Sequence, residues 1–189
     1  MQRILIVGAC LLALTGCGDK TTEPSALSGT MSVTFTGAGG GTFSASGIPP
    51  ANPDISNSTA NWAAGYVDTP GNQSSAAGVQ LRPGAHYNSV ILIMDRVTTG
   101  TATVDPGCND IEATDCTGAF LIVNGNVGDE GSFEFFCGLL TGSVVITEVG
   151  STRMKGTFSG SGECVDESLN VTSFTMTGGS FDVPRIAVP

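Results

Sequence analysis

Short runs in which apolar and polar residues alternate recur along most of this chain. Residues 31–36 alternate in this way, the glycine-rich segment 37–41 follows, and residues 42–46 resume the alternation. Successive side chains of a strand face opposite sides of a sheet, so a strand with one buried face shows a period of two. The pattern therefore predicts a β-hairpin in which residues 37–41 reverse the chain.

Similar runs predict further strands, at residues 61–67, 90–94, 119–123, 133–136, 142–149, 153–162 and 171–183. Segments rich in Pro, Gly, Asn and Ser predict loops or turns between them, at residues 48–53, 69–75, 124–126 and 150–151. No long window has a helical period. The expected fold is all-β, one domain forming an antiparallel sandwich or flattened barrel of roughly eight to ten strands.

Residues 90–94, Val-Ile-Leu-Ile-Met, are apolar at every position. A strand with one wet face would alternate, so both faces of this strand must be covered. A loop lying over the outer face is the simplest cover. A ligand cavity or a partner surface is the alternative.

The N-terminus has a different pattern, with Arg3, an apolar run at residues 4–14 and then Thr15, Gly16 and Cys17. The run is too short to cross a bilayer, which takes about 20 residues. A basic start, a short apolar run and small residues before a cleavage point are typical of a secretory signal. We expect cleavage before Cys17.

The segment Leu14 to Cys17 resembles the lipobox of bacterial lipoproteins. The resemblance implies that the Cys17 thiol carries diacylglycerol and that its freed amine is acylated, so that the membrane is a partner through this lipid. Two or more chains hold a protein on a membrane almost permanently. The expected organisation is a signal peptide at 1–16, a lipidated cysteine and flexible tether at 17–26, and an all-β domain at 27–189.

The expected localisation follows from the same resemblance. In such lipoproteins an Asp directly after the cysteine tends to retain the protein at the inner membrane, and this chain has Gly18 there. We therefore expect a protein of the bacterial cell envelope, lipid-anchored, at the outer membrane rather than the inner one.

Charge excludes one class of partner. The chain has a formal net charge of −10, and its few Lys and Arg residues do not cluster. Nucleic acid binding demands clustered basic residues, so no nucleic acid partner is expected. The acidic residues are spread along the chain and are explained by solubility.

Four cysteines remain beyond the signal and the lipid site, namely Cys108, Cys116, Cys137 and Cys164. An even set in an exported protein predicts two disulfides, for which three pairings exist. We favour Cys108 with Cys116 and Cys137 with Cys164, because the latter two flank a predicted hairpin. A zinc site is the alternative, but the chain lacks a CxxC pair and has one histidine.

Catalytic patterns are weak, and no catalytic residue or cofactor is predicted. His86 is the one histidine, and no G-x-S-x-G or phosphate-loop motif occurs. Paired carboxylates could hydrolyse glycosides, but aromatic residues make up only 6% of the chain, which leaves few rings to stack on sugars.

One acidic cluster is a weak candidate for calcium. It consists of Asp105, Asp110, Glu112 and Asp115 around the proposed Cys108–Cys116 bridge. Carboxylate oxygens suit Ca²⁺, but the spacing departs from the EF-hand loop, so a solvated acidic loop is the simpler interpretation. No other metal site is expected.

The C-terminal strands carry a second resemblance, through Gly142, Val144, 146–147, 155–159 and 178–183. They are similar to small exported bacterial lipoproteins of unknown function with a β-rich domain, which implies no catalytic residue.

The expected function is a non-enzymatic binding or structural module. Two alternatives stay open: a carrier whose barrel holds an apolar ligand, suggested by 90–94 and by Phe133, Phe135 and Phe136, and an envelope-polymer hydrolase, which needs His86 or two acids in one cleft.

Overall fold

The fold is all-β, as the alternation predicted. The computed structural model describes residues 28–37, 39–50, 55, 57–68, 73–96, 98–108, 116–129 and 132–186. These contain ten strands: β1 (Gly29–Gly37), β2 (Gly41–Gly47), β3 (Trp62–Asp68), β4 (Gln73–Arg82), β5 (His86–Met94), β6 (Gly100–Thr103), β7 (Gly118–Asn126), β8 (Phe135–Val149), β9 (Arg153–Asp166) and β10 (Val171–Ile186).

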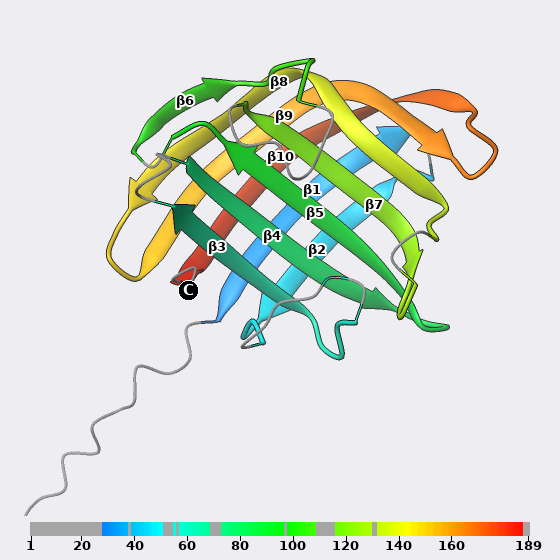
Figure 1. The fold of residues 1–189 in the computed structure, drawn as a ribbon, viewed down its shortest axis with the longest axis horizontal. Helices are drawn as coiled ribbons and strands as arrows, with labels where there is room; N and C mark the ends of the chain where they lie inside the picture. Colours follow the sequence, from blue (N-terminus) through cyan, green and yellow to red (C-terminus); the bar gives the residue numbers. More distant parts are fainter. Residues whose placement is uncertain are drawn as a thin grey trace, which may run out of the picture.

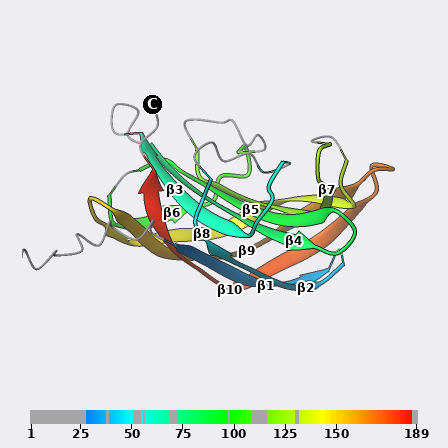
Figure 2. The ribbon, with the colours of Figure 1, turned by 90° about the horizontal axis from the view of Figure 1, so that it is seen from below.

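The strands form two layers that lie face to face (Figures 1 and 2). One layer has the order β2-β1-β10-β9-β8-β6, and the other has the order β3-β4-β5-β7. Antiparallel pairing of β7 with β8 joins the layers on one side, and a short parallel pairing of β10 with β3 joins them on the other. This is the flattened barrel or sandwich that the sequence predicted.

Strand β5 is buried on both faces. Val90, Leu92 and Met94 are fully buried in the core between the layers. Ile91 and Ile93 are buried on the outer face, in a cluster that includes Cys108 and against which Ile55 and Cys116 pack. Residues from two loops therefore cover the outer face of β5, which explains the continuous apolar run.

Several details of the sequence prediction were wrong. The loop expected at 69–75 overlaps β4, which begins at Gln73, and the strands expected at 133–136 and 142–149 both overlap a single strand, β8. Residues 124–126 do not form a turn but end β7, where Asn124 has a positive φ of 50° and the β5–β7 register shifts. A bulge accommodates a residue in this conformation without ending the strand. Strands β4 and β6 were missed, because Ala, Gly and Ser make up half of β4, and β6 consists of Gly, Thr and Ala, so both give little apolar contrast.

The described residues contain two disulfides, and these have the pairing that the sequence analysis favoured. Cys108 is bonded to Cys116 across a separation of 8 residues, and Cys137 to Cys164 across 27. The second pair lies directly opposite in the β8–β9 register and is completely buried in the core. It therefore cross-links β8 and β9 from the inside.

The start of the domain and the β9–β10 hairpin lie at opposite ends of the sandwich. Gly29 pairs with Gly47, while Gly37, at the other end of β1, pairs with Phe174 beside the β9–β10 hairpin. The Arg153 guanidinium donates a hydrogen bond to the Ser28 carbonyl at 3.2 Å. The chain therefore enters β1 at the end opposite the β9–β10 hairpin, roughly 30 Å away for nine extended residues.

Candidate functional site

A cleft of about 490 Å³ opens at the end of the sandwich that carries the β4–β5 and β9–β10 hairpins. Its lining comes from three connections. Arg82 and His86 belong to the β4–β5 hairpin, Asn124 and Asn126 to the end of β7 with residues 132–134 after it, and Glu167 to the β9–β10 hairpin. We call this hollow the end cleft. Its volume is in the range of small-molecule binding sites.

A smaller hollow of about 160 Å³ adjoins the end cleft. The two share Arg82, Asn124 and Glu134 as common lining. The smaller one, which we call the side hollow, continues to Thr42 and Asn88 beside the β1–β2 hairpin. Together the two hollows form one elongated depression, and Arg82, Asn124 and Glu134 lie where they meet.

The end cleft is polar because the inward-facing side chains of two strands, β4 and β5, change from apolar to polar toward this end. On β5 the row that begins with Met94, Leu92 and Val90 continues as Asn88 and His86. Alternate residues of a strand face the same side, so on β4 the equivalent row passes from Ala76 and Gly78 to Gln80 and Arg82. Gln80 pairs with Asn88 and Arg82 with His86 across the two strands. Four polar side chains therefore replace the apolar core at this end.

Two atoms of this group are buried without a partner. Within the described residues, Gln80 Oε1 and His86 Nδ1 are the buried side-chain nitrogen and oxygen atoms that make no hydrogen bond. A buried polar atom without a partner costs about 1–3 kcal/mol. A bound ligand that donates or accepts a hydrogen bond would provide the missing partner for each atom.

The other polar groups around the cleft are held in place by hydrogen bonds. Asn88 Oδ1 accepts a bond from the Asn124 backbone N–H at 3.0 Å, and Asn88 is itself buried. Asn124 Nδ2 donates to Glu134 Oε2 at 2.5 Å. The bulge at Asn124 thus turns its amide toward Glu134, and the pair is fixed as one wall of the cleft.

Ser132 forms the opposite part of the wall. Asn126 Nδ2 donates to Ser132 Oγ at 2.5 Å, and Ser132 Oγ donates to Glu167 Oε1 at 3.5 Å. These contacts connect the β7–β8 segment to the β9–β10 hairpin. They engage the serine hydroxyl with an amide and a carboxylate, whereas a nucleophilic serine is activated by an adjacent base such as an imidazole.

The tip that carries Glu167 is rigidly built. Asp166 Oδ1 accepts bonds from the backbone N–H groups of Ser168 and Asn170, each at 2.8 Å, and Asp166 Oδ2 accepts one from Asn170 Nδ2 at 2.9 Å. The hydrogen bonds from Asn170, side chain first and then backbone, lower the pKa of Asp166. The carboxylate therefore stays ionised and keeps the turn closed.

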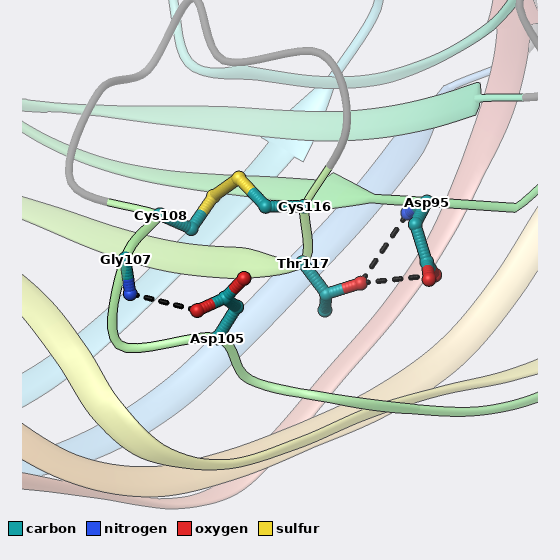
Figure 3. Close-up of a disulfide and its surroundings, with 6 residues drawn as sticks. All are labelled: Asp95, Asp105, Gly107, Cys108, Cys116 and Thr117. Carbon is teal, nitrogen blue, oxygen red and sulfur yellow. Dashed lines mark hydrogen bonds between the residues drawn. A yellow bond between two sulfur atoms is a disulfide. The ribbon is translucent and has the colours of Figure 1, made fainter.

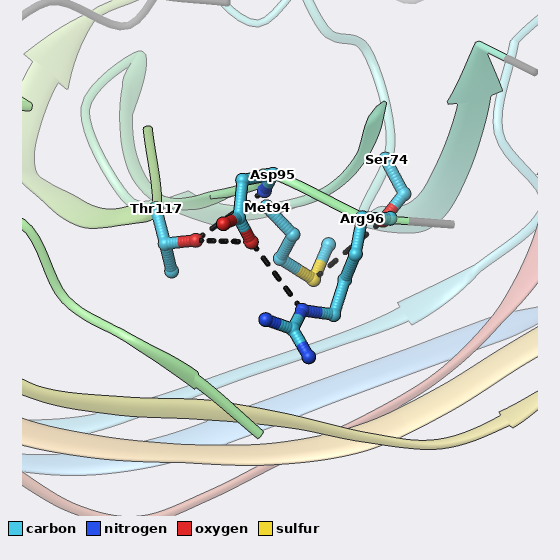
Figure 4. Close-up of polar contacts among 5 residues, drawn as sticks. All are labelled: Ser74, Met94, Asp95, Arg96 and Thr117. Atoms are coloured by element: carbon cyan, nitrogen blue, oxygen red, sulfur yellow. Dashed lines mark hydrogen bonds and ion pairs between the residues drawn. The ribbon is translucent and has the colours of Figure 1, made fainter. Parts of the chain in front are cut away.

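A second polar cluster lies at the opposite end of β4 and β5, and it is closed (Figure 4). Thr117 Oγ1 donates to Asp95 Oδ1 at 3.0 Å and accepts the Asp95 backbone N–H at 3.3 Å. Arg96 forms an ion pair with Asp95 at 3.3 Å, and Ser74 Oγ donates to the Arg96 carbonyl at 2.5 Å. We call Ser74, Asp95, Arg96 and Thr117 the closed cluster.

The calcium candidate is only partly within the described residues. Asp105 is described, and its Oδ1 accepts the Gly107 N–H at 2.8 Å beside the Cys108–Cys116 disulfide (Figure 3). Asp110, Glu112 and Asp115 lie outside the described residues, so this site stays a prediction. Among the residues described, no group of three or more His, Cys, Asp or Glu side chains is arranged to hold a metal ion.

The other sequence-predicted residues fall in different places. His86 and Phe133 line the end cleft, whereas Phe136 packs on the outer face against Phe120, with ring centroids 5.9 Å apart. Phe135 packs against the core. Cys17, with the signal and tether at 1–26, lies outside the described residues. No helix in the described ranges is long and apolar enough to cross a bilayer.

Sequence reasoning missed most of the cleft. Asn88, Asn124, Glu134 and Glu167 line the end cleft or the side hollow and come from four parts of the chain, and no motif joins them. One signal was available: polar residues replace apolar ones in the inward row of β5, at Asn88 and His86, next to a strand that is otherwise continuously apolar.

No protein-family model, no curated protein and no solved structure matches this chain. The cleft therefore has to be interpreted from its own geometry and chemistry.

Proposed function

We propose that this protein is a lipid-anchored binding protein of the bacterial cell envelope, whose β-sandwich holds a small polar ligand in the end cleft. The observation that carries the binding role is a polar cleft of about 490 Å³ beside two buried, unpartnered atoms: Nδ1 of His86, which lines the cleft, and Oε1 of Gln80, which pairs across the strands with Asn88 of the side hollow. A bound ligand that supplies hydrogen bonds would remove their energetic cost. The lipid at Cys17 is the anchor, and the outer membrane is the favoured address.

The arrangement of the ends suits this role. The chain enters β1 beside Arg153, and the end cleft lies at the other end of that strand. A lipid at Cys17 would therefore hold the domain by the end opposite the cleft. The cleft would face away from the membrane that carries the protein and toward the surrounding solution.

Binding is better supported than hydrolysis. His86, Glu134 and Glu167 do line one cleft, which is the condition that a hydrolase would need. However, the two hydrogen bonds of Ser132 engage Asn126 and Glu167, and neither provides the imidazole that a serine nucleophile uses. An envelope-polymer hydrolase stays the less supported alternative.

An apolar-ligand carrier is also less supported. The residues that suggested it, 90–94, are buried by packing on both faces of β5. An apolar groove of about 220 Å³ lies outside the core, lined by residues that include Phe120, Phe136 and Leu140. It is smaller than the end cleft and contains none of the unpartnered polar atoms.

The binding role is tested by following thermal unfolding of residues 18–189, the mature chain without Cys17, with a panel of polar metabolites. A ligand of the folded state at concentration L stabilises it by RT ln(1 + L/Kd), so the melting temperature rises with the logarithm of the ligand concentration once that concentration exceeds Kd. We expect at least one compound to stabilise the wild type, and Glu134→Gln to reduce that shift. Glu148→Gln, at an exposed ion pair with Lys155 on the β8–β9 hairpin, is the matched control. An equal shift in both variants would place binding elsewhere.

The anchor is tested separately by intact-mass analysis of the exported protein and of Cys17→Ser. We expect the wild type to begin at residue 17 with the mass of added acyl chains and to fractionate with membranes. Cys17→Ser should lack that mass. An unmodified residue 17 in the wild type would refute the anchor and leave the binding role to be judged on its own test.

A further inference from the structure

Resting on the proposed function, we propose that the ligand of the end cleft is a neutral oligosaccharide, bound across the end cleft and the side hollow. The shared chemistry is a set of hydroxyl groups on linked sugar rings. Such a ligand has two possible sources, free sugars in the envelope space and the chain end of an envelope polysaccharide.

The mixture of donors and acceptors favours hydroxyl groups. The cleft carries donors in Arg82 and in the side-chain amides, and it carries acceptors in the Glu134 and Glu167 carboxylates. A hydroxyl both donates and accepts, so it satisfies either kind of neighbour. Each carboxylate has about four acceptor sites, of which the bond from Asn124 to Glu134 or from Ser132 to Glu167 uses a small part.

The charges of the cleft argue against a charged ligand. An anion would face the carboxylates of Glu134 and Glu167, and a cation would face Arg82, all in the lining of one hollow. Like charges at close range are unfavourable in a partly desolvated site. A neutral ligand avoids both costs and still uses the charged groups as strong hydrogen-bond partners.

The shape of the depression favours more than one ring. The end cleft and the side hollow have volumes of about 490 and 160 Å³ and share Arg82, Asn124 and Glu134. An elongated ligand would occupy both, with these three side chains contacting its middle. A single small molecule would fill one hollow only.

Phe133 supplies the apolar contact that a sugar ring needs. Its half-buried ring lines the end cleft and is backed by Phe136, with ring centroids 5.9 Å apart. The C–H face of a sugar packs on such a ring, while its hydroxyl groups point to the polar wall. The low aromatic content of the chain therefore does not exclude a sugar, because one well-placed ring is present.

The test is a glycan array that carries neutral and acidic glycans, probed with the mature chain and followed by calorimetry of the best binders. We expect neutral oligosaccharides to bind, and the matching monosaccharide to bind at least about tenfold more weakly because it reaches one hollow only. Glu134→Gln and Phe133→Ala should each weaken binding about tenfold or more, and Glu148→Gln should leave Kd unchanged.

Soluble trisaccharides and purified envelope polysaccharide are measured side by side to distinguish the two sources. Preference for the soluble sugar indicates a free ligand, preference for the polymer indicates a chain end, and either supports the proposal. An array without neutral binders, combined with a charged metabolite that stabilises the wild type but not Glu134→Gln, overturns the ligand class and leaves the proposed function intact. If no compound of either set binds, both proposals fail.

Discussion

Strands β4 and β5 carry a polar cluster at each end, and the two clusters differ in one respect. In the closed cluster, the side chains of Asp95 and Thr117 bond to each other, and Arg96 and Ser74 complete the contacts. At the end cleft, Gln80 and His86 each leave a buried atom without a partner. The same strands thus end in a self-sufficient polar network on one side and in an incomplete one on the other.

This difference indicates that the polar residues of the closed cluster stabilise the fold, whereas we propose that those of the end cleft bind a ligand. A satisfied network stabilises the fold that contains it, whereas an incomplete one costs stability in the absence of another molecule. We therefore expect substitutions at the closed cluster to change the free energy of unfolding and leave binding intact. Substitutions at the end cleft should weaken binding without lowering the free energy of unfolding.

The largest effect is expected from the disulfide that joins β8 to β9. The double substitution Cys137→Ser and Cys164→Ser should lower the free energy of unfolding by about 3.5 kcal/mol, because the bond closes a separation of 27 residues. The matching change at Cys108 and Cys116, with a separation of 8, should cost about 2.5 kcal/mol. Urea denaturation measures both, and a larger loss for the short loop would contradict this ranking.

The closed cluster is broken by Thr117→Val, which keeps the shape of the side chain and removes its hydroxyl. Thr117 is buried, and its hydroxyl makes two hydrogen bonds with Asp95. We expect the free energy of unfolding to fall by about 1–2 kcal/mol. Ligand affinity at the end cleft should stay the same, and a parallel loss of affinity would show that the two ends are coupled.

The end cleft is probed by Gln80→Met, which replaces an unpartnered amide with an apolar side chain of similar length. Removing the buried, unpaired Oε1 should raise the free energy of unfolding by about 1 kcal/mol. Ligand binding should weaken at the same time. A variant that is less stable than the wild type would mean that Gln80 has a structural partner.

The outer face of β3 gives a pH-dependent effect that neither cluster influences. Burial raises the pKa of Tyr66 to about 12 from its usual 10.0. Between these values the unfolded state loses the phenol proton and the folded state keeps it, so stability should fall as pH rises from about 10 to 12. The melting temperature of Tyr66→Phe, compared with wild type across this range, should show a shallower decline. Identical declines in melting temperature for the two proteins would contradict the raised pKa of Tyr66 as the cause.

The fold was largely predictable from sequence, and the cleft was not. Alternation in 31–36 and the apolar run at 90–94 depend on which face of a strand is buried, which is a local property that the sequence displays. The cleft depends on which hairpins meet at one end, and that is set by long-range pairing. His86 was noted as a single histidine, but its neighbours Glu134 and Glu167 lie far along the chain.

The most direct test of the account is a crystal structure of the mature chain at better than about 1.2 Å, where hydrogen positions become visible. We predict an ordered water or bound ligand within hydrogen-bond distance of Gln80 Oε1 and of His86 Nδ1, and a closed cluster in which the buried Thr117 hydroxyl bonds only to Asp95. A collapsed cleft in which neighbouring side chains satisfy both atoms would contradict it.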